Sequence, residues 1–411
     1  MKRSVPASDA DHSFEKVPES SRKGFWPMFF VMLGFTFFSA SMSVGAKLGN
    51  GLDLKGFVAA VLAGGVILAS YTGVLAYIGC KTGLSFDLLA RKTFGTVGSY
   101  LPSLMIALTQ VGWFGVGVAM FAIPASDVIG CSKWVLIAVA GICMTSSAYF
   151  GIKGMEIVSY VSVPLIVVLG VYSMVTASAQ GGGVAAIFTR NYGTLTVYEG
   201  VGLVVGSFIS GGTTTPNFTR FARGKTASVV ATVIAFFIGN SLMFAFGAVG
   251  GAFTGHEDIF YIMIAQGLTV QALIVLGANI WTTNDNSLYS GALSLANITG
   301  VPKRPLVIAE GIAGTLASIW LYDNFVSWLN ILNATLPPVG AVVILDYAVR
   351  LRKEQGEEKE PVFIIPSVAG VAAGALVGII SRSGMSSLLS MGAACLCYYV
   401  LGIFFTNRGR E

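Results

Sequence analysis

Long apolar stretches separated by short polar connections run through most of the chain. Stretches of about 18–25 mostly apolar residues are long enough to cross a bilayer as helices. Twelve occur here, at residues 25–49, 54–79, 98–124, 133–151, 155–178, 197–222, 226–252, 266–297, 305–322, 324–347, 362–381 and 385–405. The pattern predicts an all-α integral membrane protein with twelve transmembrane helices. None of the connections is long enough to form a soluble domain with an active site.

The predicted membrane unit covers residues 25–405, between polar tails at 1–24 and 406–411. The N-terminal tail is mixed in charge and lacks the charged, apolar and cleavage regions of a signal peptide, so we expect it to stay attached and cytoplasmic. The distribution of Lys and Arg residues between the two sides of the membrane supports this orientation. With both termini inside, 20 of the 25 basic residues lie on inner segments. This bias follows the positive-inside rule for the cytoplasmic membrane.

Composition agrees with this class and excludes others. The chain is 54% hydrophobic and 11% charged, whereas an ordinary soluble domain is about 25% charged. With only His12 and His256, no histidine-based metal centre or catalytic triad is expected in the core. The five cysteines do not suggest a disulfide framework. The net charge of +5 is modest, so nucleic acid is not implied, and no obligate protein partner is evident.

Two apolar stretches contain segments that disfavour a continuous helix. The first stretch is small and hydroxylated from Gly34 to Gly45, and the sixth contains Gly211, Gly212 and Pro216. The two stretches are five spans apart, so the second would enter the membrane from the opposite side. This arrangement predicts a 5+5 inverted repeat, about 25–178 against about 197–347, with two additional C-terminal helices. In transporters of this kind, paired broken helices mark a binding site near the membrane midplane.

The eighth stretch carries the most polar cluster of the apolar regions, Asn279 to Asn286. Asn279, Thr282 and Thr283 share one face of a helix. One carbonyl and two hydroxyls are neutral oxygens that would suit a small hard cation such as Na⁺, and carbonyls freed near Gly34 and Phe37 would complete the set. Hydrogen bonding between helices explains the same residues equally well.

A second group of residues suits a flat heteroaromatic ligand. Gln110 offers amide donors and an acceptor, Trp113 lies close to it on the same helix, and Phe208 lies in the second break. Two aromatic faces and an amide would stack on such a ligand and bind its edge. Packing is the alternative role for these side chains.

Asp285 is the main carboxylate expected inside the membrane, and Glu310 is another. Ionisable groups at membrane depth are functional candidates. A proton relay is open for either residue, and for Asp285 a structural hydrogen bond or exposure to a water-filled cavity is equally open.

Three motifs, at residues 110–124, 206–211 and 281–286, resemble bacterial cytosine permeases of nucleobase:cation symporter family 1, and the resemblance extends over nearly the whole chain. It implies a leucine-transporter-like fold and sodium-coupled uptake by alternating access. By position, Trp113 and Phe208 would sandwich the base. Its edge would be bound by four further residues, Gln110, Ser210, Asn279 and Asn284. The implied sodium site consists of the carbonyls of Gly34, Phe37 and Asn279 and the hydroxyls of Thr282 and Thr283.

These observations favour a sodium-coupled importer of cytosine in the cytoplasmic membrane. One alternative is a different cargo, such as a purine, hydantoin or allantoin, or proton coupling through Asp285. A channel or a receptor is a second alternative, against which the inverted broken helices argue. An intramembrane enzyme is disfavoured because the sequence shows no nucleophile–base pair.

Overall fold

The computed structural model describes residues 11–189, 193–256, 259–352, 361–381 and 384–408. Within these ranges the regular structure is helical, apart from an isolated bridge between Lys23 and Ala222. The first half of the chain forms the 3₁₀ turn η1 (Glu19–Ser21) and helices α1 (Phe25–Thr36), α2 (Ser39–Gly51), α3 (Leu54–Thr82), α4 (Phe86–Phe94), α5 (Tyr100–Ile129), α6 (Lys133–Tyr149), α7 (Ile152–Gln180) and α8 (Val184–Phe188).

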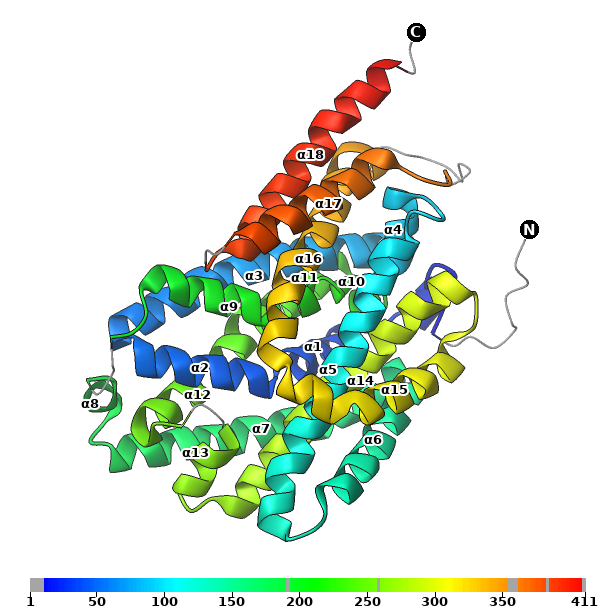
Figure 1. The fold of residues 1–411 in the computed structure, drawn as a ribbon. Coiled ribbons are helices and arrows are strands. Elements are labelled where there is room, and N and C mark those ends of the chain that lie inside the picture. Colours follow the sequence, from blue (N-terminus) through cyan, green and yellow to red (C-terminus); the bar gives the residue numbers. More distant parts are fainter. Residues whose placement is uncertain (1–10, 190–192, 257–258, 353–360, 382–383, 409–411) are drawn as a thin grey trace.

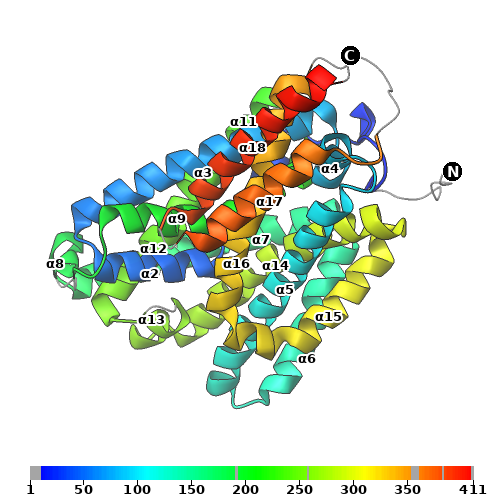
Figure 2. The ribbon, with the colours of Figure 1, turned by 45° about the horizontal axis from the view of Figure 1, so that its top comes forward.

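The second half contains two π-helical turns, η2 and η3, as well as α-helices. In order, its elements are α9 (Val197–Gly212), α10 (Thr215–Thr219), α11 (Lys225–Val233), η2 (Ile234–Gly239), α12 (Asn240–Thr254), α13 (Ile259–Ala265), α14 (Thr269–Thr299), α15 (Lys303–Asp323), α16 (Phe325–Asp346), η3 (Tyr347–Leu351), α17 (Ile365–Ile380) and α18 (Ser386–Arg408). The turn η1 and the C-terminal end of α18 lie on the side of α4, away from α8 (Figures 1 and 2).

Each of the twelve predicted stretches coincides with helical structure. In the described part of the chain, seven helices are long and apolar enough to cross a membrane, and the bent pair α1–α2 makes an eighth. Three shorter apolar helices, α6, α9 and α17, also coincide with predicted spans. The polar 31-residue α14 coincides with the eighth. The number of spans stays a prediction. Helices α4, α8 and α13 lie in connections where the apolar pattern predicts no helix.

Both predicted breaks are present in the structure, which shows where the chain turns in each. The first lies at Phe37–Phe38, where the backbone becomes extended and the axes of α1 and α2 differ by 54°. The second lies at Thr213–Thr214, between α9 and α10. In the first break the small and hydroxyl residues flank the turn, and the chain itself turns at two aromatic residues. In the second the chain turns at two threonines, between the glycines and the proline that predict the break.

Helices of the two predicted repeats pack in reciprocal pairs. α2 lies so close to α12 that a Cβ on Gly45 would be 2.2 Å from the carbonyl oxygen of Phe244. In the counterpart pair, α10 lies against α3, and a Cβ on Gly79 would be 2.8 Å from Cα of Pro216. Likewise, α5 contacts α15 as α14 contacts α6. Exchanged contacts of this kind are expected of two inverted copies of one unit.

Connections that are predicted on one side of the membrane meet in the structure. The inner connection before α15 meets the N-terminal tail through Lys303 Nζ, which is 2.8 Å from Asp11 Oδ2. Two outer connections meet through a hydrogen bond from Leu195 N to the carbonyl oxygen of Gly51 at 3.2 Å. These contacts agree with the predicted arrangement of the loops. Two basic residues of the predicted outer side, Arg190 and Arg382, lie outside the described residues.

Candidate substrate and cation site

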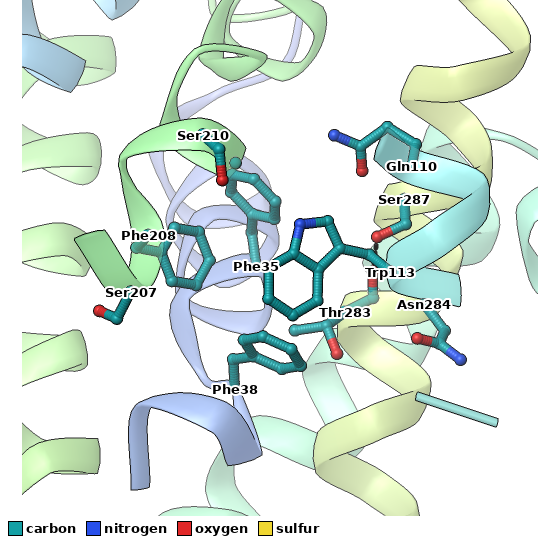
Figure 3. Close-up of a pocket in the computed structure, with 11 residues that line it drawn as sticks. Phe35, Phe38, Gln110, Trp113, Ser207, Phe208, Ser210, Thr283, Asn284 and Ser287 are labelled. Carbon is teal, nitrogen blue, oxygen red and sulfur yellow. Dashed lines mark hydrogen bonds between the residues drawn. The ribbon is translucent and has the colours of Figure 1, made fainter. Parts of the chain in front are cut away.

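A pocket lies where the break after α1 meets α5, α9 and α14 (Figure 3). About 380 Å³ of space is free of protein atoms here, a volume that includes space open to solvent. Its eleven lining residues come from these four regions and are Phe35, Phe38, Gln110, Trp113, Ser207, Phe208, Ser210, Gly211, Thr283, Asn284 and Ser287. Five of the six predicted substrate residues are therefore together at one cavity.

Aromatic rings form much of the pocket wall. Trp113 enters from α5 and Phe208 from α9, on opposite sides of the cavity (Figure 3). Phe38 meets Trp113 edge to face, with ring centroids 5.1 Å apart, and Phe35 meets Phe208 in the same way at 5.1 Å. Such contacts fix ring orientation. Phe35 and Phe38 are not among the predicted site residues, because an aromatic residue in an apolar run is identified as part of the pocket wall only once the position of the break is known.

Three of the predicted polar residues have buried atoms without a hydrogen-bond partner among the described residues. They are Nε2 of Gln110, Oγ of Ser210 and Oδ1 of Asn279, and of these residues Gln110 and Ser210 line the pocket. Buried polar groups are nearly always hydrogen-bonded, so unpaired ones need an explanation. An occupant with donors and acceptors on its edge would provide the missing partners.

The two predicted asparagines contact neighbouring helices through their amide nitrogens. Asn284 lines the pocket, but its amide nitrogen donates to the carbonyl oxygen of Phe114 at 3.1 Å and lies 3.2 Å from Sδ of Met144. Asn284 therefore ties α14 to α5 and α6. Asn279 does not line the pocket, and its side chain approaches Met243 on α12.

The predicted cation ligands of α14 do lie together. The carbonyl oxygen of Asn279 is 2.9 Å from Oγ1 of Thr282 and 3.2 Å from Oγ1 of Thr283, with each hydroxyl donating to it. Hydroxyls in helices commonly bond back to a carbonyl in this way. Rotation of the two hydroxyl hydrogens would turn all three oxygens into ligands. The donor set is neutral, as suits a hard monovalent cation.

The break in α1 lies against these oxygens. A Cβ on Gly34 would be 3.6 Å from Cβ of Thr282 and 2.4 Å from Oγ of Ser159, so α1, α7 and α14 meet here. Phe37 donates its amide to Leu33 and ends α1, which leaves the carbonyls of the last turn outside the helical ladder. The Ser159 hydroxyl is buried and lacks a partner among the described residues, which makes it a further candidate ligand that the sequence does not reveal.

Two buried carboxylates lie outside both groups. Asp285 is fully buried, and Glu310 is 2% exposed with its oxygens against Gly291 of α14. None of their four oxygens has a hydrogen-bond partner in the part of the chain that the structure describes. The Ser147 side chain and the Asn286 backbone nevertheless lie close enough to interact with the Asp285 carboxyl group, so both a structural role and a proton relay stay open for Asp285.

Comparison with known proteins places the chain among transporters. Residues 16–364 match the family described as "Permease for cytosine/purines, uracil, thiamine, allantoin". The cytosine permease of Escherichia coli K12 is 51% identical over 348 residues, which cover 84% of this chain and 83% of that protein. The hydantoin permease of Microbacterium maritypicum is 25% identical over 318 residues, covering 69% and 63%.

Solved structures show the same fold. Mhp1, a nucleobase-cation-symport-1 family transporter in a closed conformation with bromovinylhydantoin bound, aligns with a TM-score of 0.81 at 18% identity, over 96% of this chain and 94% of that one. A Na⁺-coupled sialic acid symporter aligns with a TM-score of 0.74 at 15% identity, over 96% and 92%. The fold is leucine-transporter-like, as predicted. The chain therefore belongs to nucleobase:cation symporter family 1, the membrane permeases of cytosine, purines and related compounds.

Proposed function

We propose that this chain imports cytosine together with Na⁺ by alternating access, in the cytoplasmic membrane and with both termini inside. The observation that carries the proposal is the pocket of Figure 3, in which Trp113 and Phe208 face a cavity that also contains the unpaired amide of Gln110. A pyrimidine has two aromatic faces and an edge of donors and acceptors, and it matches this set. The 51% identity to a cytosine permease supports the same cargo.

Sodium fits the second group of residues. The carbonyl of Asn279 and the hydroxyls of Thr282 and Thr283 are neutral oxygens, and each hydroxyl lies within 3.2 Å of the carbonyl. Gly34, in the last turn of α1 before the break, packs against Thr282. Hard monovalent cations prefer such oxygens to nitrogen or sulfur. When bound, Na⁺ would supply a positive charge that holds α1 against α14. The residues themselves orient the oxygens and exclude water. Asn279 serves this site through its carbonyl, away from the substrate pocket.

The test is thermal stabilisation of the detergent-purified protein by cytosine, in sodium and in choline at one ionic strength. A ligand that binds the folded protein alone raises its stability by mass action. We expect cytosine to stabilise in sodium and much less in choline, and uracil and adenine to have no effect. Equal stabilisation in the two salts would rule out sodium coupling. No response to cytosine would rule out the cargo.

Proton coupling is the second candidate, and the buried carboxylate of Asp285 favours it. An ionisable carboxyl group at membrane depth is a candidate to carry a proton. Asp285→Asn separates the candidates. Under sodium coupling it leaves the sodium dependence of cytosine stabilisation intact, whereas under proton coupling it removes the pH dependence of uptake.

A further inference from the structure

The tail expected on the cytoplasmic side is packed against the transporter. Residues 11–24, which we call the strap, lie across one end of the helix bundle, on the side of α4 (Figures 1 and 2). Despite the polar composition of the strap, Asp11 is 5% exposed and Val17 is fully buried. Val17 N donates to the carbonyl oxygen of Gly83, just after α3, at 2.9 Å.

The beginning of the strap binds two buried cations. Asp11 Oδ2 is 2.8 Å from Lys303 Nζ at the start of α15, and both side chains are buried. Arg220, fully buried after α10, donates from Nη2 to the carbonyl oxygen of Asp11 at 2.7 Å and from Nη1 to that of His12 at 2.9 Å. Removing one partner of a buried ion pair leaves the other charge uncompensated and is costly. The strap therefore cannot leave this end of the bundle without exposing or rehydrating Lys303 and Arg220.

The other end of the strap is held by backbone pairing and a second ion pair. Lys23 N donates to the carbonyl oxygen of Phe221 at 2.6 Å, and Arg223 N donates to that of Lys23 at 2.9 Å. The ammonium group of Lys23 also pairs with Glu156 of α7. Between the two ends, Arg22 donates to the carbonyl oxygen of Cys80 in α3 at 3.0 Å.

The contacts of the strap join two groups of helices, and the substrate pocket lies between these groups. Lys303 and Glu156 belong to α15 and α7, which contact α14. Arg220 and Cys80 belong to the α10 end and α3, which contacts α9. The pocket lies between α1 and α9 on one side and α5 and α14 on the other. If the two groups separated at this end, a path to the pocket would open and the contacts of Asp11 would break.

We propose that the strap is the latch of the cytoplasmic gate, closed by Asp11 against Lys303 and Arg220 and released when the transporter opens inward. This inference rests on the proposed transport function, because it assigns the latch to one step of that cycle. A strap that was merely a fixed part of the fold would make the same contacts and would not respond to ligands.

Cys80 is a native reporter of strap release, since it is 1% exposed and lies under Arg22. In a background with the other four cysteines, Cys131, Cys143, Cys395 and Cys397, replaced by serine, we would measure the rate at which N-ethylmaleimide labels Cys80. Asp11→Asn keeps the size of the side chain and weakens the ion pair. Glu15→Gln is the matched control, because it removes one negative charge from the same strap at a carboxylate that pairs with His12 near the surface.

We expect Asp11→Asn to raise the labelling rate without ligand by about tenfold, as a change of about 1.4 kcal/mol in the opening equilibrium produces. Saturating cytosine and sodium should reverse most of the rise, since ligands shift the population toward the state they prefer. Glu15→Gln should label like the parent. Unchanged labelling of Asp11→Asn, or a rise that ligands do not reverse, would overturn the latch.

A second variant and a binding measurement on the parent protein distinguish failure of the latch from failure of the proposed function. If Asp11→Asn does not fold, Lys23→Gln breaks the partly exposed pair with Glu156 instead, and it should raise labelling in the same ligand-sensitive way. Thermal stabilisation of the parent by cytosine and sodium tests the proposed function by itself. A parent that binds both ligands while Asp11→Asn and Lys23→Gln label at the parent rate refutes the latch alone. A parent that binds neither ligand refutes the proposed function instead.

Discussion

Gln110→Leu separates a ligand-binding role from a packing role, because the two roles predict opposite effects on stability. In the ligand-free protein the amide nitrogen of Gln110 is buried in the pocket wall without a partner among the described residues. Leucine has a similar size and no polar atom. Burying a polar group without a hydrogen bond costs free energy, so this substitution should leave the free energy of unfolding unchanged or raise it.

The effect on binding should be a loss. Without the Gln110 amide, a group on the edge of the base is left unpaired in a closed pocket, which costs about 1–3 kcal/mol. At about 1.4 kcal/mol for each factor of ten, the Kd for cytosine should rise roughly 5- to 140-fold. The assay is thermal unfolding of the purified variant without ligand and across a cytosine titration in sodium.

Asn284→Leu is the matched comparison on the same pocket wall. The amide nitrogen of Asn284 donates to the carbonyl oxygen of Phe114 at 3.1 Å, so its loss should lower the free energy of unfolding by about 0.5–1.5 kcal/mol. A Gln110→Leu variant that melts earlier than the parent and binds cytosine equally well would refute the ligand-binding role of Gln110.

Four other substitutions test the cation site, the aromatic wall of the pocket and the buried carboxyl group of α4. Thr282→Ala or Thr283→Ala should weaken apparent cytosine affinity mainly by raising the sodium concentration required; a lower transport rate with unchanged sodium dependence would refute the cation site. Trp113→Ala should cost about 1–3 kcal/mol of cytosine binding, as stacking on a base does elsewhere; unchanged binding by calorimetry would move the substrate away from α5. Asp87 in α4 is buried, and burial raises the pKa of its carboxyl from 3.8 to about 6. The folded state therefore holds an extra proton between about pH 4 and pH 6, and stability falls as the pH rises through this window. Asp87→Asn should flatten that part of the melting-temperature profile relative to the parent, and parallel profiles would contradict the assignment.

The fold could be predicted because its signals are repeated and local. Apolar stretches of membrane length indicate the helices, and two interrupted stretches five spans apart indicate the repeat. The exact positions of the breaks are harder to predict from the sequence. Phe37 and Phe38 carry the same side chain as Phe35, which is helical in the same apolar run, so the chain turns there because of its surroundings. The position of a break is therefore a tertiary property, even when its neighbourhood is visible in the sequence.

The candidate site likewise contains residues that the sequence indicates and residues that only the structure reveals. Gln110 and Ser210 stand out as polar residues in apolar stretches, and the structure places both at the pocket. Ser159 is equally polar but looks like an ordinary packing serine until Gly34 is placed against it. The packing of the strap could not be predicted, because the Asp11 carboxylate pairs with Lys303, which lies far away in the sequence. Long-range pairing of buried charges leaves no periodic signal in one sequence.

Thr283 suggests why the two proposed ligands would depend on each other. It lines the substrate pocket, and its Oγ1 lies 3.2 Å from the Asn279 carbonyl that belongs to the proposed cation site. A cation at that carbonyl would turn the hydrogen of the Thr283 hydroxyl away from it, toward the cavity. It would also draw the α1 break, which carries Phe35 and Phe38 of the pocket wall, against α14. One ligand would thus build part of the other's site, and because binding free energies are linked, cytosine must strengthen cation binding by the same factor.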